Sequence, residues 1–288
     1  MTISKFFNSM KSFFDSKKLN ISINCFLFII IALVSACSTC TKDYMFVALL
    51  STANATCIYA LSRRLKLSNT ISYIVCLSWI IRLLCLQNLN VEAISNDGNH
   101  HLIYLNKILE KGYILIPKSF ECYLCYHPPL YYIFSALISK LLTFIIGIRG
   151  QYHSVFSLLC SLISSYYAYL LFRLIWLEKR LKLNLLTRKI CLLLSISLFI
   201  FWPLSIANSI KIGNDNLLNL LYIMGLFYLL KWSKYDDNKS LFLSSIIASL
   251  ALWTKTTGLV LMLLIVLSVI VCQFFHMKKL NKKNEACN

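Results

Sequence analysis

Long apolar runs separated by short polar breaks make up most of this chain. Runs of about 17–25 apolar residues, the length that a helix needs to cross a bilayer, recur along it. The pattern predicts an all-α fold, a polytopic bundle of about eight transmembrane helices. The predicted crossings cover 21–38, 44–61, 70–89, 154–177, 191–206 and 217–232, with two more inside 241–275, a run that breaks at the polar segment 253–258.

The apolar run 128–148 needs a separate interpretation. It begins with Pro128 and Pro129, which suit the start of a helix. The basic cluster at 178–182 belongs on the cytoplasmic side, so an odd number of crossings must separate it from the polar stretch 96–132. We therefore predict that 128–148 is a juxtamembrane helix on or in the outer leaflet and that 154–177 is the crossing.

The basic residues predict the orientation of the bundle. They cluster in the breaks at 63–66, 178–189 and 231–234 and near both ends of the chain, and the positive-inside rule places these clusters and both termini in the cytoplasm. The chain then divides into a basic amphipathic N-terminus (1–20), three transmembrane helices (21–89), an exoplasmic loop with juxtamembrane helices (90–150), further transmembrane helices with outer loops near 207–216 and 254–258 (151–277), and a basic tail (278–288).

The composition excludes a soluble globular domain. Of the 288 residues, 58% are hydrophobic and only 14% are charged, so a soluble fold would have too few polar side chains to cover its surface. The net charge is +18, but the basic residues lie between apolar runs, so membrane orientation explains them better than a nucleic-acid partner does. The 12 cysteines lie mostly inside apolar runs and do not form a disulfide framework.

The stretch 96–132 differs from the rest of the chain because it carries three of the five histidines, His100, His101 and His127, together with charged residues that include Asp97 and Lys118. The predicted topology brings two further polar segments to the same outer surface, 211–215 and 254–257. Charged groups near the hydrocarbon are costly, and their collection on one face of a membrane protein indicates a functional site. The candidate residues in these two segments are Lys211, Asp215 and Lys255.

These segments, in this order, resemble the C-type polytopic glycosyltransferases. Asp97 after an early helix, an amphipathic stretch with Gly112, and His-Pro-Pro-Leu-Tyr-Tyr at 127–132 are similar to the first outer loop of protein O-mannosyltransferases and lipid A aminoarabinose transferases. Asn-Asp-Asn-Leu at 214–217 resembles the family's second outer acid, Trp-Thr-Lys-Thr-Thr-Gly at 253–258 its later Thr-Lys-x-x-Gly segment, and Trp-Ile-Ile-Arg at 79–82 its Arg-bearing helix. Gly98 departs from the pattern, since many relatives carry Glu there.

The resemblance implies an enzyme that transfers a sugar from a polyprenyl-phosphate donor to a hydroxyl-bearing acceptor (a protein, lipid or glycan) at the exoplasmic face, with inversion. Asp97 would be the general base that takes the acceptor's proton. The candidate cations for the leaving lipid phosphate are Lys255, Lys118, Lys211, His127 and Arg82. Further substrate-binding candidates are His100, His101, Tyr131 and Asp215. Asp97 and Asp215 are also candidate ligands for a divalent cation, Mg²⁺ or Mn²⁺.

Each of these residues also has a structural interpretation. Asp97 and Asp215 could be helix N-caps, and Lys255 could be an interfacial lysine that extends its amine toward water. Arg82 could form an internal pair. Cys122 and Cys125, followed by His127, form part of a zinc pattern, but no second ligand pair follows, so free thiols or a local disulfide fit better.

Two other classes of function stay open. A transporter or flippase of a lipid-linked substrate predicts inverted repeats and paired charges at mid-membrane, and Arg82 alone fits that pattern. A truncated, non-catalytic partner subunit is the other alternative.

Overall fold

The computed structural model describes residues 17–39, 44–88, 97–112, 127–146, 152–178 and 182–285. Every regular element among these residues is a helix, so the all-α prediction is confirmed. The elements are α2 (Lys17–Thr39), α3 (Tyr44–Arg64), α4 (Asn69–Asn88), α6 (Gly98–Lys111), α7 (Leu130–Ile146), α8 (His153–Trp176), α9 (Leu185–Phe201), α10 (Pro203–Ile210), α11 (Asp215–Tyr235), α12 (Asn238–Thr254), the 3-10 turn η1 (Thr256–Gly258) and α13 (Leu259–Glu285).

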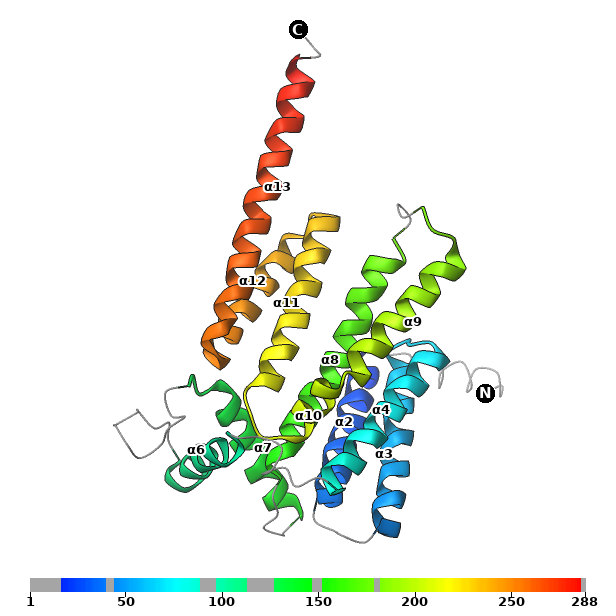
Figure 1. Ribbon diagram of the computed structural model, residues 1–288, viewed down its shortest axis with the longest axis vertical. Coiled ribbons are helices and arrows are strands. Elements are labelled where there is room, and N and C mark those ends of the chain that lie inside the picture. The colour runs from blue at the N-terminus through cyan, green and yellow to red at the C-terminus, as the bar shows by residue number, and fades with distance from the viewer. Residues whose placement is uncertain are drawn as a thin grey trace, which may run out of the picture.

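Helix α8 lies between two groups of helices and packs against both (Figure 1). On one side it contacts α2, α4 and α9, and its Leu158 enters a core with Ile58 and Trp79. On the other side it contacts α7 and α11, and its Cys160 enters a second core that contains Leu221. Because one helix belongs to both cores, the ends of the two groups are held in fixed positions relative to each other.

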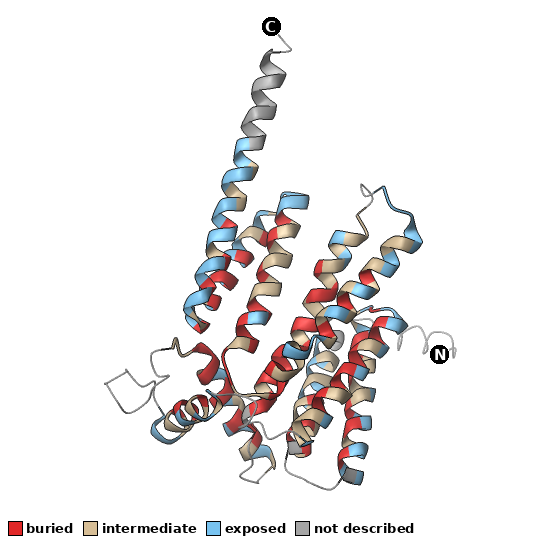
Figure 2. Cartoon of the chain, in the orientation of Figure 1, coloured by how far each residue is buried: buried red, intermediate tan, exposed pale blue. Residues whose placement is uncertain are grey.

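The outer surface of the bundle is apolar. Exposed residues occur on both groups of helices (Figure 2). Many of them are large hydrophobics, among them Phe26, Met45, Tyr73, Phe144, Leu198, Phe242 and Leu267. Such a surface is unfavourable in water and is solvated by lipid. In the described part of the chain five helices are long and apolar enough to cross a membrane, or six if α9 and α10 form one bent span. These features fit an integral, multi-pass membrane protein.

Most predicted boundaries agree with the structure, and one break was not predicted. The run 191–206 is divided between α9 and α10, which meet at a 45° bend. Pro203 is the first residue of α10, where its missing N–H is tolerated, and a proline there cannot continue α9. The predicted break at 253–258 is observed between α12 and α13.

The number of crossings and their sides stay predictions. Helix α12 has 17 residues and α11 carries polar residues at both ends, and neither is among the five long apolar helices. Helix α7 is an apolar helix of 17 residues, which matches the extent expected for the predicted juxtamembrane segment but does not place it in a leaflet.

Two of the predicted cytoplasmic connections lie together. Lys234 near the end of α11 forms an ion pair with Glu178, which follows α8. The α8–α9 and α11–α12 connections lie at the upper ends of these helices in Figure 1, and α11 and α13 start at their own lower ends. Which side of the membrane each of these ends faces stays a prediction.

Candidate functional site

Carboxylates, lysines and histidines from four separate segments meet near the start of α11. The segments are the start of α6, the residues before α7, the α10–α11 connection and the turn between α12 and α13. The residues that interact there are Asp97, His101, His127, Lys211, Asp215 and Lys255. The fold therefore brings together six of the site residues that were predicted from the sequence.

An acid flanked by two lysines forms one half of this cluster. Lys255 Nζ lies 2.6 Å from Asp215 Oδ1, and Lys211 Nζ lies 3.9 Å from Asp215 Oδ2. Burial by itself would raise the pKa of Asp215, but the hydrogen bond and charge of Lys255, together with Lys211, outweigh it and lower the pKa. Asp215 is therefore ionised at neutral pH and holds both ammonium groups close to one point.

Two asparagines fix the start of α11, where Asp215 lies. Asn214 is 1% exposed, and its Nδ2 donates to the carbonyl oxygen of Thr254 at 3.3 Å. The Nδ2 of Asn216 donates to the carbonyl oxygens of Ser157 and Asn208, at 3.2 and 2.6 Å. Within the sequence Asn-Asp-Asn the two amides thus hold the backbone against neighbouring segments, and Asp215 between them faces the lysines.

The turn that carries Lys255 requires a glycine. A Cβ added at Gly258 would lie 2.3 Å from the backbone carbon of Ala251 in α12, closer than real contacts allow. The Gly258 N–H donates to the carbonyl oxygen of Lys255 at 2.8 Å, and the Tyr222 hydroxyl donates to that of Thr257 at 2.7 Å. This tight turn against α11 sets the position of the lysine relative to Asp215.

His101 forms the centre of the other half of the cluster. It is 9% exposed, its Nδ1 lies 2.5 Å from the Tyr132 hydroxyl, and its ring stacks on that of His127 with centroids 6.3 Å apart. A Cβ added at Gly213 would lie 3.6 Å from Nε2, so the ring faces this backbone. Burial, followed by the charge of His127, lowers the pKa of His101 to about 4, although Asp215 and Asp97 oppose the change. His101 is therefore neutral at pH 7.

His127 directly precedes Pro128 and Pro129, the two residues before α7. The carbonyl oxygen of Pro129 accepts the first helical hydrogen bond, from the N–H of Ile133 at 3.0 Å. Burial and the nearby charge of Lys255 lower the pKa of His127, and Asp215 and Asp97 oppose this. His127 thus lies close enough to both acids and to Lys255 for their charges to change its pKa.

Asp97 is exposed and lies at the N-cap position of α6 without acting as a side-chain cap. Its carbonyl oxygen accepts from the His101 N–H at 3.0 Å, but its carboxylate makes no capping hydrogen bond. The helix ends at Gly112, whose φ of 73° is the left-handed conformation that glycine adopts easily. The capping role that could have explained Asp97 is therefore not observed, and its carboxylate is open to the cluster.

Two predicted site residues have other partners. Arg82 is 1% exposed inside the bundle and donates from Nη1 to the carbonyl oxygen of Ser78 and from Nη2 to that of Ile200 (2.9 Å) and to Ser205 Oγ (3.2 Å). Arg82 thus provides a hydrogen-bond donor for a carbonyl oxygen near the end of α9, at the bend between α9 and α10. Tyr131 is fully buried, with its hydroxyl 2.8 Å from Ser157 Oγ, and belongs to the core.

The structure describes only one of the remaining candidates, His100. His100 is half-buried on α6 and, one residue before His101, is rotated by about 100° around the helix axis from it. Lys118, Cys122 and Cys125 lie outside the described residues.

Sequence reasoning missed Tyr132 and the anchoring role of Asn214 and Asn216. The predicted tyrosine was Tyr131, but α7 turns the next residue, Tyr132, toward His101. Both asparagines were part of a segment that was singled out for its acid. Three consecutive polar residues at the start of an apolar helix were the available signal for their role.

A groove of about 770 Å³ lies beside the cluster, between α8, α9, α10 and α11. Ser161, Ser164, Asn208, Asn216 and Tyr222 provide much of its polar lining, and Phe199 and Leu226 are among its apolar walls. Asn208 is 8% exposed, and its Oδ1 has no hydrogen-bond partner among the described residues. Ser205 also lines the groove and accepts from Arg82, so the guanidinium group lies directly behind this wall.

The donor set offers limited support for a bound divalent cation. Among the described residues no group of three or more His, Cys, Asp and Glu side chains could hold a metal ion. Both oxygens of Asp215 already face lysine ammonium groups, which would have to move before a cation could bind. Metal binding by Asp97 and Asp215 stays a prediction, and no step below depends on it.

No family model matches this chain, and neither the curated proteins nor the solved structures include a match. The assignment of a function therefore depends on the geometry of the site and on the resemblance of its motifs.

Proposed function

We propose that this chain is an integral membrane glycosyltransferase that transfers a sugar from a polyprenyl-phosphate donor to a hydroxyl-bearing acceptor at the exoplasmic face. The observation that carries the proposal is the convergence of Asp97, Asp215 and Lys255, with two histidines, at one end of an apolar bundle. Packing does not require ionisable groups from four separate segments to meet there, and such groups at a membrane boundary are typical of a site.

The topology in this proposal has eight crossings, with both termini in the cytoplasm and the cluster outside. The donor's isoprenoid chain stays in the bilayer and enters from the side, along the groove between α10 and α11. Its phosphate then lies near Lys255 and Lys211, with the charge of Arg82 behind the groove wall contributing at longer range.

The chemistry is a single displacement. Asp97 takes the proton from the acceptor hydroxyl as that oxygen bonds to C1 of the sugar. The bond between C1 and the phosphate oxygen breaks, its electron pair stays on the phosphate, and Lys255 and Lys211 stabilise the negative charge that develops. Asp215 keeps the two lysines in place, and the configuration at C1 inverts because no enzyme nucleophile takes part.

The proposal is tested with the purified full chain and a panel of polyprenyl-phosphate sugars, with membrane extract as the source of acceptors. The measurements are the release of free polyprenyl phosphate and the incorporation of labelled sugar. A glycosyltransferase releases the lipid phosphate only when an acceptor is present, and Asp97→Asn slows the release at least about 100-fold. A flippase would instead move the intact donor between the leaflets of proteoliposomes without release, and that result would replace the proposal.

A further inference from the structure

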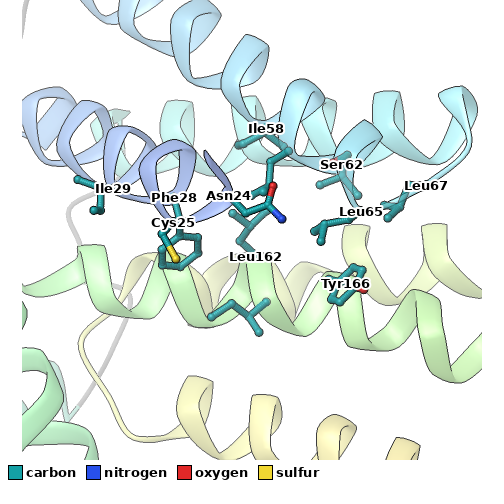
Figure 3. A pocket seen from close by; sticks show the side chains of 13 residues that line it. Asn24, Cys25, Phe28, Ile29, Ile58, Ser62, Leu65, Leu67, Leu162 and Tyr166 are labelled. Atoms are coloured by element: carbon teal, nitrogen blue, oxygen red, sulfur yellow. The ribbon is translucent and has the colours of Figure 1, made fainter. Parts of the chain in front are cut away.

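A second cavity, of about 470 Å³, lies between α2, α3, α4 and α8 (Figure 3). It is lined by residues near the start of α2, the end of α3 and the start of α4. Its walls are almost entirely apolar and include Phe28, Ile58, Leu61, Val75 and Leu162. Exposed residues on α2 also line it, among them Ile29, so it opens sideways toward the surface that faces lipid. An apolar space of this size is unfavourable when empty, because its walls lose packing partners and water finds few hydrogen-bond partners there.

Two arginines lie at the rim of this cavity. Arg64 Nε donates to Asn24 Oδ1 at 3.0 Å, and Asn24 lines the cavity. Arg63 Nη1 donates to the carbonyl oxygen of Leu67, another lining residue. Both arginines are exposed, and the described parts of α2, α3 and α4 contain no Asp or Glu. The rim is therefore positive, without an acidic residue on the three helices that form it.

An apolar cavity that opens sideways, with guanidinium groups at its rim, is complementary to a lipid with a negatively charged headgroup. Guanidinium groups bind phosphate through paired N–H donors, and basic residues at the cytoplasmic surface attract anionic lipids. We propose that this cavity binds one acyl chain of an anionic phospholipid and that Arg63 and Arg64 hold its phosphate.

This lipid is distinct from the proposed sugar donor, because the cavity and the groove proposed for the donor share no lining residue. The cavity is lined from α2, α3, α4 and one side of α8, whereas the groove is lined from another side of α8 and from α9, α10 and α11. The inference does not depend on the glycosyltransferase proposal, since it concerns binding to other residues.

The test measures lipid binding to the delipidated full chain in detergent by native mass spectrometry. Phosphatidylglycerol is compared with phosphatidylcholine of the same acyl chains. We expect one tightly bound phosphatidylglycerol and at least tenfold weaker phosphatidylcholine. Equal affinities for the two lipids would overturn the proposal without the need for any variant.

Two variants then locate the bound lipid. Cys25→Trp, which fills the exposed mouth of the cavity, and the double substitution Arg63→Gln/Arg64→Gln should each weaken phosphatidylglycerol at least tenfold. Lys182→Gln/Lys189→Gln is the matched control, because it also removes two exposed positive charges, neither residue lines the cavity, and binding should be unchanged. An equal loss in the control would show attraction by overall charge, and full binding to the Trp variant would place the lipid elsewhere.

Discussion

Lys255 Nζ lies 2.6 Å from Asp215 Oδ1, and this ion pair joins the turn between α12 and α13 to the first residue of α11. Two polar segments that are separated by 40 residues are thereby held together at one end of the bundle. Both side chains keep partial contact with solvent, at 29% and 36% exposure, so the pair is screened and its net energy is modest.

The pair should show a measurable coupling. Asp215→Asn and Lys255→Met each remove one charge, and the double variant should be more stable than the sum of the two single effects predicts, by about 1 kcal/mol. The free energies of unfolding of the four proteins in detergent provide the coupling energy. Additive single effects would mean that the pair does not exist in solution.

The pH dependence of stability should reflect the burial of His101. Its pKa falls from 6.5 to about 4 on folding, so the unfolded chain binds its proton more tightly than the folded chain does. Its contribution to stability is therefore complete above about pH 6.5 and decreases as the pH falls toward 4, by up to about 3 kcal/mol. Melting temperatures from pH 7.5 to 4 measure this change.

His101→Phe is the variant that isolates this titration, because phenylalanine keeps a ring against that of Tyr132. Its melting temperature should depend less on pH over that interval, with the remaining slope due to His127, whose pKa is also lowered. The lowered pKa of Asp215 acts in a different range, since its contribution is present above about pH 4 and is lost below that. An unchanged slope in His101→Phe would assign the effect to other groups.

The sequence predicted the helices well because a bilayer allows few alternatives. Apolar runs in lipid must satisfy their backbone hydrogen bonds internally, so run length and polar breaks alone locate most helices. The bend at Trp202 was missed because the apolar pattern continues through it. Pro203 was the local signal for the bend. At the bend Arg82 donates to the carbonyl oxygen of Ile200, and the spacing of polar residues could not reveal this contact, because the two residues are 118 positions apart.

The site was predictable as a set of residues but not as a set of contacts. Polar groups in apolar surroundings are conspicuous, which located Asp97, Asp215 and Lys255. Which tyrosine faces His101 depends on the rotation of α7, and whether Asp97 caps its helix depends on a rotamer. The spacing of polar residues reveals neither the rotation of the helix nor the rotamer. The sequence therefore favoured Tyr131 over Tyr132 and allowed a capping role for Asp97 that the structure does not show.

The hydrogen bonds of Arg82 predict a large effect on stability. Arg82→Met removes the donors to Ile200 and Ser205 and should destabilise the chain by roughly 1–3 kcal/mol. Arg82→Lys keeps the charge but loses the fork of donors, so an intermediate loss is expected. Unfolding in detergent measures both effects. Arg173→Met, at an exposed position on α8, is the control and should change stability by less than about 0.5 kcal/mol.

The predicted topology can be tested by labelling single cysteines in a chain whose 12 native cysteines are replaced. Cysteines at the exposed positions Asn99 and Thr256 should react with an impermeant reagent from one side of the membrane. Cysteines at the exposed positions Ser68 and Lys239 should react from the other side. If positions 99 and 256 react from opposite sides, the cluster cannot form in the membrane and the proposed active site is wrong.

The role of Asp97 can be separated from stability because its carboxylate does not cap α6. Asp97→Asn and Asp97→Ala should both keep the wild-type melting temperature. Sugar transfer should fall by at least about 100-fold in both, since a general base contributes about 100- to 10,000-fold to the rate. Transfer and melting temperature are measured on the same preparations.

Asp237 is the matched control for Asp97, because it is an N-cap that does make capping hydrogen bonds. Its carboxylate accepts from the Lys239 N–H at 3.2 Å and from Ser240 Oγ at 2.7 Å, at the far end of α12. Asp237→Ala should lose about 1 kcal/mol of stability and keep the rate of transfer. The two acids thus predict opposite outcomes, loss of activity without loss of stability at Asp97 and the reverse at Asp237. If Asp97→Asn transfers sugar at the wild-type rate, Asp97 is not the base and the proposed mechanism fails.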